Sequence, residues 1–250
     1  MGFGTHSYVT GDIHGSIDIG KLTPERWPEG QRLFRCDLLL ICGDFGLIWS
    51  EEPSVEDRYF LGWLNAQPWT TVFVDGNHEN HDLLDAVPVS TWHGGKVHVL
   101  PRYENIVHLM RGQVFDMGVL GMWFTMGGAW TRDSSWRIPG DGWWPRELPS
   151  DEEYEEARRN LDRVGWSVDY VITHECPRSR RHAAMPDWYC EEFDPADKLS
   201  IFLDEVDERI DQERLKRWYS GHYHADITLG DEKHVMLYRQ IIPFGRTLGT

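Results

Sequence analysis

Five short stretches of this 250-residue chain place aspartate, asparagine or histidine directly after a run of β-forming residues. Carboxylate oxygens, amide oxygens and imidazole nitrogens are all metal ligands. In chain order the residues at these ends are Asp12 and His14, Asp44, Asn77 and His78, His174, then His222 and His224. One such group alone is a common turn or surface feature. Five of them, each after a predicted strand, favour a metal site.

The number of candidate ligands indicates how many cations the site could hold. Residues i and i+2 of an extended segment point to the same side, so Asp12 with His14, and His222 with His224, could each share a cation. The chain offers seven nitrogen or oxygen ligands and one further histidine. This is more than a tetrahedral site needs. It suffices for two five- or six-coordinate cations with one carboxylate between them.

The segments before these ends are predicted to be strands and helices of an α/β protein. Apolar or β-branched runs predict strands at 7–10, 37–41, 71–74, 169–173 and 217–220. Apolar faces with helical spacing occur at 55–64, after the capping box that begins at Ser150, and at 197–210. The first strands are about 30 residues apart, as a βαβ unit requires.

Two regions follow a different pattern. Short runs separated by turns between His93 and Trp130 predict adjacent, largely antiparallel strands. Near the end of the chain, the runs 227–229 and 235–242 predict a closing hairpin around Gly230. The segment 133–149 contains three prolines and two glycines, and is predicted to be a long surface loop.

Composition limits the classes of partner. The formal net charge is −16, which argues against broad binding to nucleic acid or to anionic membranes. No apolar run approaches the roughly 18 residues of a membrane helix. Cys36 and Cys42 flank an apolar run and are expected to be buried free thiols, which suits a reducing compartment. We therefore expect a soluble cytoplasmic protein.

Taken together, the ordered motifs resemble those of the calcineurin-like metallophosphoesterase superfamily. They are Gly-Asp-x-His-Gly at 11–15, Gly-Asp at 43–44, Gly-Asn-His-Glu at 76–79, Thr-His at 173–174 and Gly-His-x-His at 221–224. The resemblance implies an α/β fold, a four-layer αββα sandwich of two mixed β-sheets flanked by helices. It also implies one domain over residues 1–250, with a Trp-rich loop insertion around 130–150.

The same resemblance assigns roles to the candidate residues. One metal ion would be bound by Asp12, His14, Asp44 and His224, and the other by Asp44, Asn77, His174 and His222. His78 would lie beside the phosphate as general acid or electrostatic clamp. The implied reaction is hydrolysis of a phosphate mono- or diester through attack of a metal-bridged hydroxide. Mixed imidazole and carboxylate ligands favour Mn, Fe, Zn or Ni over Ca.

The motif after the second strand departs from one branch of the superfamily. Protein Ser/Thr phosphatases carry Gly-Asp-x-x-Asp-Arg-Gly, whereas this chain has Leu47 and Ile48 in place of the acid and the arginine. A protein phosphatase of that type is therefore disfavoured, and the acidic composition, which offers no long track for a nucleic acid, favours a phosphorylated small molecule or nucleotide as substrate. What orients His78 is left open, and Asp75 and Glu79 are candidates to hold it or a ligand histidine.

The loop around 130–150 has two interpretations. Arg132 and Arg137 could bind a phosphate while Trp143 and Trp144 stack on a base or sugar. The alternative is a Trp-rich loop packed on the core, which thirteen tryptophans favour somewhat. For the whole chain, the alternative to an enzyme is a catalytically silent binding module with the same fold. The oligomeric state is left open.

Overall fold

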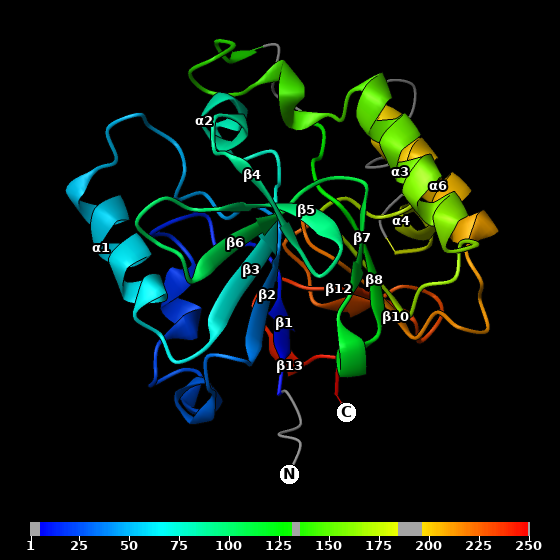
Figure 1. Cartoon of the computed structure of the whole chain (residues 1–250), viewed down its shortest axis with the longest axis horizontal. Coiled ribbons are helices and arrows are strands. Elements are labelled where there is room, and N and C mark those ends of the chain that lie inside the picture. Colours follow the sequence, from blue (N-terminus) through cyan, green and yellow to red (C-terminus); the bar gives the residue numbers. More distant parts are fainter. Residues whose placement is uncertain (1–5, 132–135, 185–196, 250) are drawn as a thin grey trace.

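Two mixed β-sheets face each other in the computed structural model, which describes residues 6–131, 136–184 and 197–249 (Figure 1). The first sheet has the order β13 (Ile241–Pro243), β1 (Tyr8–Thr10), β2 (Leu38–Cys42), β3 (Thr70–Val74), β6 (Ile106–Leu109), β5 (Gly95–Val99) and β4 (Val89–Trp92). Strands β1, β2, β3 and β6 are parallel, and the edge pairs are antiparallel.

The second sheet repeats this plan. Its order is β11 (Ile227–Thr228), β12 (His234–Met236), β10 (Arg217–Ser220), β9 (Tyr170–Thr173), β8 (Met122–Met126) and β7 (Gln113–Asp116). The central strands are again parallel and the outer pairs antiparallel. Parallel strands need crossovers, which here carry the helices.

Helices cover the outer faces of both sheets. They are α1 (Val55–Asn65), α2 (His81–Asp85), α3 (Asp151–Arg163), α4 (Arg178–Ala184) and α6 (Lys198–Arg209). Short 3₁₀ turns are η1 (Ile19–Leu22), η2 (Pro28–Arg32), η3 (Gly118–Leu120) and η5 (Pro145–Glu147). In Figure 1, α1 lies on one side of the sandwich and α3 and α6 lie on the other.

Three apolar layers explain why this arrangement forms. Alternate residues of β2 point to opposite faces, so Leu38 and Leu40 pack between the sheets while Leu39 and Ile41 pack outward under the α1 layer. A third cluster lies between the second sheet and helices α3 and α6. Because the central strands are buried on both faces, they read as continuous apolar runs. The predicted α/β sandwich of two mixed sheets flanked by helices is confirmed.

Two regions differ from the predicted pairing. The short strands between His93 and Trp130 are divided between the sheets: β5 and β6 join the first sheet, and β7 and β8 join the second. The run 235–242 is divided as well, because β12 pairs with β11 whereas β13 pairs with β1 at the edge of the other sheet. Local periodicity identifies strands but carries no information on the sheet that receives them.

The cysteines also differ from expectation. Cys42 and Cys176 are buried free thiols, but Cys36 is exposed in the turn before β2, so the prediction that Cys36 is buried is wrong. Cys190 lies outside the described residues. Among the described residues, no helix has the length and apolar character that crossing a bilayer requires.

Asp207 of α6 connects this helix to the second sheet through His234 and to α4 through Arg180. Asp207 Oδ1 lies 3.1 Å from His234 Nε2, and Arg180 Nε donates to Asp207 Oδ2 at 2.8 Å. Burial raises the pKa of Asp207, but His234 and Arg180 outweigh burial and lower it to about 2. A folded-state pKa below the unfolded value of roughly 3.9 stabilises the fold above that pH, and this stability is lost as pH falls through 2.

We predict that Asp207→Asn destabilises the protein by about 2–3 kcal/mol at pH 7, since each unit of pKa shift is worth roughly 1.4 kcal/mol. About half of this difference should remain at pH 3, where the carboxylate of the unfolded chain is largely protonated. Urea unfolding of both proteins at the two pH values measures it. A difference that does not change with pH would show that the variant acts through packing.

Candidate metal centre

The candidate ligands lie at one rim of the sandwich because the parallel strands end there. In the first sheet, Thr10 is level with Ile41, and Cys42 is level with Val74. Asp12, Asp44 and Asn77 follow these strand ends, and His174 and His222 follow β9 and β10 in the facing sheet. The carboxyl ends of parallel strands are where ligands bind in open α/β sheets. The site therefore lies across the two sheets.

The chain turns sharply at this rim. His14, Asp44, His222 and His224 have φ values of 42°, 46°, 69° and 50°. These are four of the seven non-glycine residues with positive φ among the residues described. Side chains disfavour this region, which costs on the order of 1 kcal/mol per residue. The predicted extended geometry of the two i, i+2 pairs is thus replaced by left-handed turns, and His222 and His224 diverge.

Glycines before the ligands allow close approach. A β-carbon on Gly76 would lie 2.0 Å from Asp44 Oδ1, and one on Gly43, whose φ is 93°, would lie 2.1 Å from His174 Nδ1. Both distances are far below van der Waals contact. The glycines of the Gly-Asp and Gly-Asn motifs are therefore required by packing between neighbouring strand ends.

The first ligand group consists of Asp12, His14 and His224, whose potential ligand atoms all lie within 4.8 Å of one another. Asp12 Oδ2 lies 3.8 Å from His14 Nε2 and 3.4 Å from His224 Nε2. The two imidazole Nε2 atoms are 3.2 Å apart. Asp12 Oδ2 is buried and has no hydrogen-bond partner in the part of the chain that the structure describes. A cation between these atoms would satisfy all three.

The second group consists of Asp44, His174 and His222, again with ligand atoms within 4.8 Å of one another. His174 Nε2 lies 3.2 Å from Asp44 Oδ1. Asn77 joins this group, since its Oδ1 lies 3.3 Å from His174 Nε2. His222 stands beside His174, with ring centroids 5.0 Å apart. The group offers one carboxylate, two imidazoles and one amide oxygen.

Asp44 connects the two groups. Its Oδ2 lies 3.3 Å from His14 Nε2, while its Oδ1 lies 3.2 Å from His174 Nε2. The carboxylate is buried and also accepts a hydrogen bond from the backbone N–H of His78 at 2.8 Å. Each oxygen therefore faces a histidine of a different group, which is the geometry of a carboxylate shared by two cations.

Hydrogen bonds at the far side of two imidazoles leave the correct nitrogen for a metal ion. His174 Nδ1 lies 2.7 Å from the carbonyl oxygen of Cys42, which can only accept, so Nδ1 carries the proton. His14 Nδ1 lies 2.8 Å from Asp18 Oδ2 in the same way. When Nε2 loses its proton to a metal ion, its lone pair faces the centre, because the hydrogen bond at Nδ1 fixes the tautomer and the orientation of the ring.

The electrostatics also fit cations. Burial raises the pKa of Asp44, but His174 and His14 outweigh burial and hold it well below its usual value. Burial lowers the pKa of His174, yet Asp44 and Asp12 raise it to about 10. The carboxylates thus attract positive charge strongly enough to hold protons on buried imidazoles. Divalent ions would supply this charge instead, so the residues fit a metal centre.

His78 lies at the edge of this arrangement. Its ring stands at 73° to that of His14, with centroids 5.6 Å apart. Burial lowers the pKa of His78, and Asp44 partly offsets this. Among the described residues, its imidazole has no hydrogen-bond partner, although its backbone is tied to Asp44. The ring is therefore available to a ligand.

The expected supports of His78 act elsewhere. Asp75 pairs with Arg111 at 2.6 Å and with His108 at 3.0 Å, and in the described part of the chain it bonds to no candidate ligand histidine. Glu79 accepts the backbone N–H groups of the two residues after Asp44, at 2.6 and 3.3 Å. Leu47, which stands where the protein phosphatase motif has an acid, is buried in the apolar cluster between the first sheet and α1. An apolar contact therefore takes the place of a polar one at this position.

Of the residues proposed to bind substrate from the loop around 130–150, Arg137 lies near the candidate site and Trp144 packs on the protein. Arg137 lies close enough to His78 for its charge to lower the pKa of that histidine, and its Nη1 donates to the carbonyl of Gly142 at 3.1 Å. Arg132 lies outside the described residues. Trp144 is buried and donates to Asp82, so it packs on α2 instead of forming a substrate rim.

Three residues at the site were not predicted as partners of ligands. Asp18 binds His14, and Thr131 and Glu147 form a buried hydrogen-bonded pair beside Asn77. Asp18 follows His14 by four residues, a spacing that a turn could have suggested. Thr131 follows the predicted strand that becomes β8. Glu147 has no local signal, because its partner is 16 residues away across the loop.

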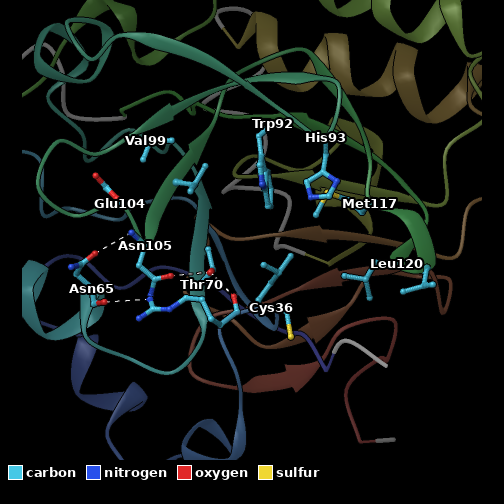
Figure 2. Close-up of a pocket in the computed structure, with 14 residues that line it drawn as sticks. Cys36, Asn65, Thr70, Trp92, His93, Val99, Glu104, Asn105, Met117 and Leu120 are labelled. Carbon is cyan, nitrogen blue, oxygen red and sulfur yellow. Dashed lines mark hydrogen bonds between the residues drawn. The ribbon is translucent and has the colours of Figure 1, made fainter. Parts of the chain in front are cut away.

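A cavity of about 800 Å³ lies away from this centre (Figure 2). It is lined by the first residues of β2 and β3, Leu38 and Thr70, and by Trp92 and Met117. These are the amino ends of the strands, opposite to the ligand rim. The cavity contains neither ligand group, so the chemistry of the side chains, and not pocket size, identifies the candidate site.

Comparison with known proteins agrees with the geometry. The sequence profile of the calcineurin-like phosphoesterases matches residues 6–226. No curated protein matches the chain at a significant level. A provisionally named 5′-nucleotidase from Staphylococcus aureus, solved with α-ketoglutarate, aligns with a TM-score of 0.51 at 13% identity. The alignment covers 95% of this chain and 49% of that one, so this chain spans about half its length.

A second solved structure aligns over 93% of this chain and 89% of its own, at 12% identity and a TM-score of 0.49. Identities this low show a shared fold only, and the second structure adds no argument. The staphylococcal structure supports the sandwich architecture, and the profile match supports the family.

We predict that Asp18→Asn weakens metal binding by the first group roughly 10–100-fold, the cost typical of losing a carboxylate behind a ligand histidine. The carboxylate holds the Nδ1 proton of His14, and the amide holds it less firmly. Titration of metal-free protein with Mn²⁺ measures the change. Asp141→Asn, an exposed loop aspartate, is the matched control. Equal affinities in both variants would contradict a supporting role for Asp18.

Proposed function

Because the chain belongs to the calcineurin-like phosphoesterase family, we propose that it is a phosphoesterase that uses two divalent metal ions. One observation carries the proposal. The two oxygens of Asp44 face His14 of one ligand group and His174 of the other, at 3.3 and 3.2 Å. A single carboxylate between two sets of nitrogen and oxygen ligands is what a dinuclear centre needs.

In the proposed site, one ion would be held by Asp12, His14, Asp44 and His224, and the other by Asp44, Asn77, His174 and His222. Two such ions lower the pKa of water and neutralise charge on phosphoryl oxygens. Imidazole-rich ligand sets favour Mn, Fe, Zn or Ni. Asp44 would set the distance between the ions, because its two oxygens face different ligand groups.

His78 and Arg137 would act on the substrate. The His78 imidazole has no protein partner among the residues described, so it can donate a hydrogen bond to the leaving-group oxygen or hold a phosphate oxygen. Arg137 carries a fixed positive charge close to His78. It would bind the phosphate from the loop side, where the arginine of the protein phosphatase motif is replaced by Ile48.

We favour a phosphorylated small molecule or nucleotide as substrate. A net charge of −16 leaves no long basic track for a nucleic-acid chain. The three described cysteines are free thiols, and we propose a cytoplasmic location on this basis. Both monoesters and diesters are compatible with the arrangement of His78 and Arg137.

We predict that Mn²⁺-loaded protein hydrolyses p-nitrophenyl phosphate or bis(p-nitrophenyl) phosphate, and that Asp44→Asn abolishes both activity and metal loading. The loss should exceed the roughly 10–100-fold typical of residues outside the ligand shell. Release of nitrophenol and metal content per chain are the two measurements. If Asp44→Asn keeps both, the dinuclear assignment is wrong. If fully loaded wild-type protein hydrolyses neither ester, the binding-module alternative is favoured.

We further predict that His78→Ala lowers kcat about 10²–10⁴-fold, the usual contribution of an acid or base group, while two metal ions remain bound. His78 contributes its backbone N–H and not its ring to the ligands, so its removal should spare metal loading. His6→Ala, at an exposed histidine, is the control. Loss of metal in His78→Ala would reassign His78 to the ligand shell.

A further inference from the structure

Asn77 differs from the carboxylates of the centre, because an amide has an acceptor oxygen on one side and a donor nitrogen on the other. Its Oδ1 lies 3.3 Å from His174 Nε2, and its Nδ2 donates to Thr131 Oγ1 at 3.1 Å. The oxygen would bind a cation, whereas the amide hydrogens would repel it. The orientation of this one side chain therefore decides whether it acts as a ligand.

Thr131 is fixed in turn by Glu147. Thr131 Oγ1 donates to Glu147 Oε2 at 2.5 Å, and the backbone N–H of Thr131 donates to Oε1 at 2.7 Å. Burial raises the pKa of Glu147 to about 7, so above that pH its carboxylate is ionised and only accepts hydrogen bonds, while a hydroxyl has one proton to give. When that proton goes to Glu147, the lone pairs of Oγ1 are left to accept from Asn77.

The three side chains are shielded from water. Asn77 is 5% exposed, Thr131 is 4% exposed and Glu147 is 1% exposed. In such surroundings a rotated amide would leave its own donor and the threonine hydroxyl without correct partners, at a cost of about 1–3 kcal/mol per group. The hydrogen bonds therefore run in one direction, from the Asn77 amide to Thr131 and from Thr131 to Glu147, with no solvent to replace these partners.

The end of this chain is held from outside the metal centre. Arg111 Nη2 donates to the backbone carbonyl of Glu147 at 3.1 Å. The same guanidinium binds Asp75 through Nε at 2.8 Å and Nη2 at 2.6 Å. Asp75 directly follows β3, two residues before Asn77. Arg111 therefore fixes the position of Glu147 relative to the end of β3, which carries Asn77, although the two residues are 70 positions apart in the chain.

We propose that Thr131 and Glu147 are positioning residues that hold the Asn77 amide with its oxygen towards Asp44 and His174. The inference rests on the proposed function in so far as it assumes that cations bind at this centre. Asn77 contacts His174 of the second ligand group and has no hydrogen bond to the first group among the described residues. The effect should therefore fall on one cation of the two.

Thr131→Val tests this directly, because it removes the hydroxyl and keeps the shape. We predict that the Mn²⁺ ion at the second ligand group, which includes His174, binds roughly 10–100-fold more weakly. The ion at the first ligand group should keep its affinity. Calorimetric titration of metal-free protein resolves the two events. Hydrolysis of the nitrophenyl esters should be lost at low Mn²⁺ and recovered at high Mn²⁺, which a residue acting on substrate would not show.

Three further variants make the test specific. Thr131→Ser keeps the hydroxyl and should restore tight binding of both ions. Glu147→Gln can donate as well as accept, so it should weaken the second ion without removing a side chain. It also carries the test if Thr131→Val does not fold. In an Asn77→Asp background both oxygens are ligands, so adding Thr131→Val should change affinity much less.

The outcomes separate this inference from the proposed function. Wild-type protein that binds two ions but hydrolyses neither ester would overturn the phosphoesterase proposal, while the titrations would still judge Thr131. If Thr131→Val binds both ions as tightly as wild-type protein, or weakens both equally, the positioning role is overturned. Wild-type protein that takes up no second ion would overturn both.

Discussion

The buried carboxylate of Asp44 is the constraint around which this molecule is arranged. A charge removed from water must be paired, and here the pairing groups are imidazoles from two sheets, at 3.3 and 3.2 Å. A carboxylate with a histidine on each side attracts positive charge, which protons on the imidazoles or divalent ions could supply. The left-handed turns, the glycines and the parallel strand ends all serve to bring these groups together.

The strand ends store energy for this purpose. His14, Asp44, His222 and His224 adopt backbone conformations that side chains disfavour. Such strain persists only where the surrounding structure imposes it. Here it is imposed by buried apolar layers on both faces of each sheet, so the stability of the sandwich holds the ligands in place. Part of the free energy of folding thus offsets the backbone strain at the four candidate ligands.

Much of this could be read from the sequence. The run 37–41 and the strand before His174 were placed because buried parallel strands are continuous apolar segments, and five such segments ending in ligands defined the site. The division of 235–242 between two sheets could not be read, since periodicity does not specify a partner strand. The roles of Thr131 and Glu147 were also hidden, because they depend on a loop that returns to β3. The prediction for Cys36 is wrong because this residue lies two positions before the buried strand β2, in an exposed turn.

The two sheets are joined unequally along their common face. At the rim, residues of both sheets converge on Asp44, whereas at the amino ends of β2 and β3 a cavity of about 800 Å³ lies between the first sheet and the turn that follows β7 (Figure 2). Metal ions bound at the rim would contact residues of both sheets. Their binding would therefore stabilise the packing of one sheet against the other. Removal of the ions should weaken the packing between the sheets near the rim. Amide hydrogen exchange should then become faster in β2 and β9 than in β5. In the proposed metal centre, the ions that act on the substrate would also hold the two sheets together.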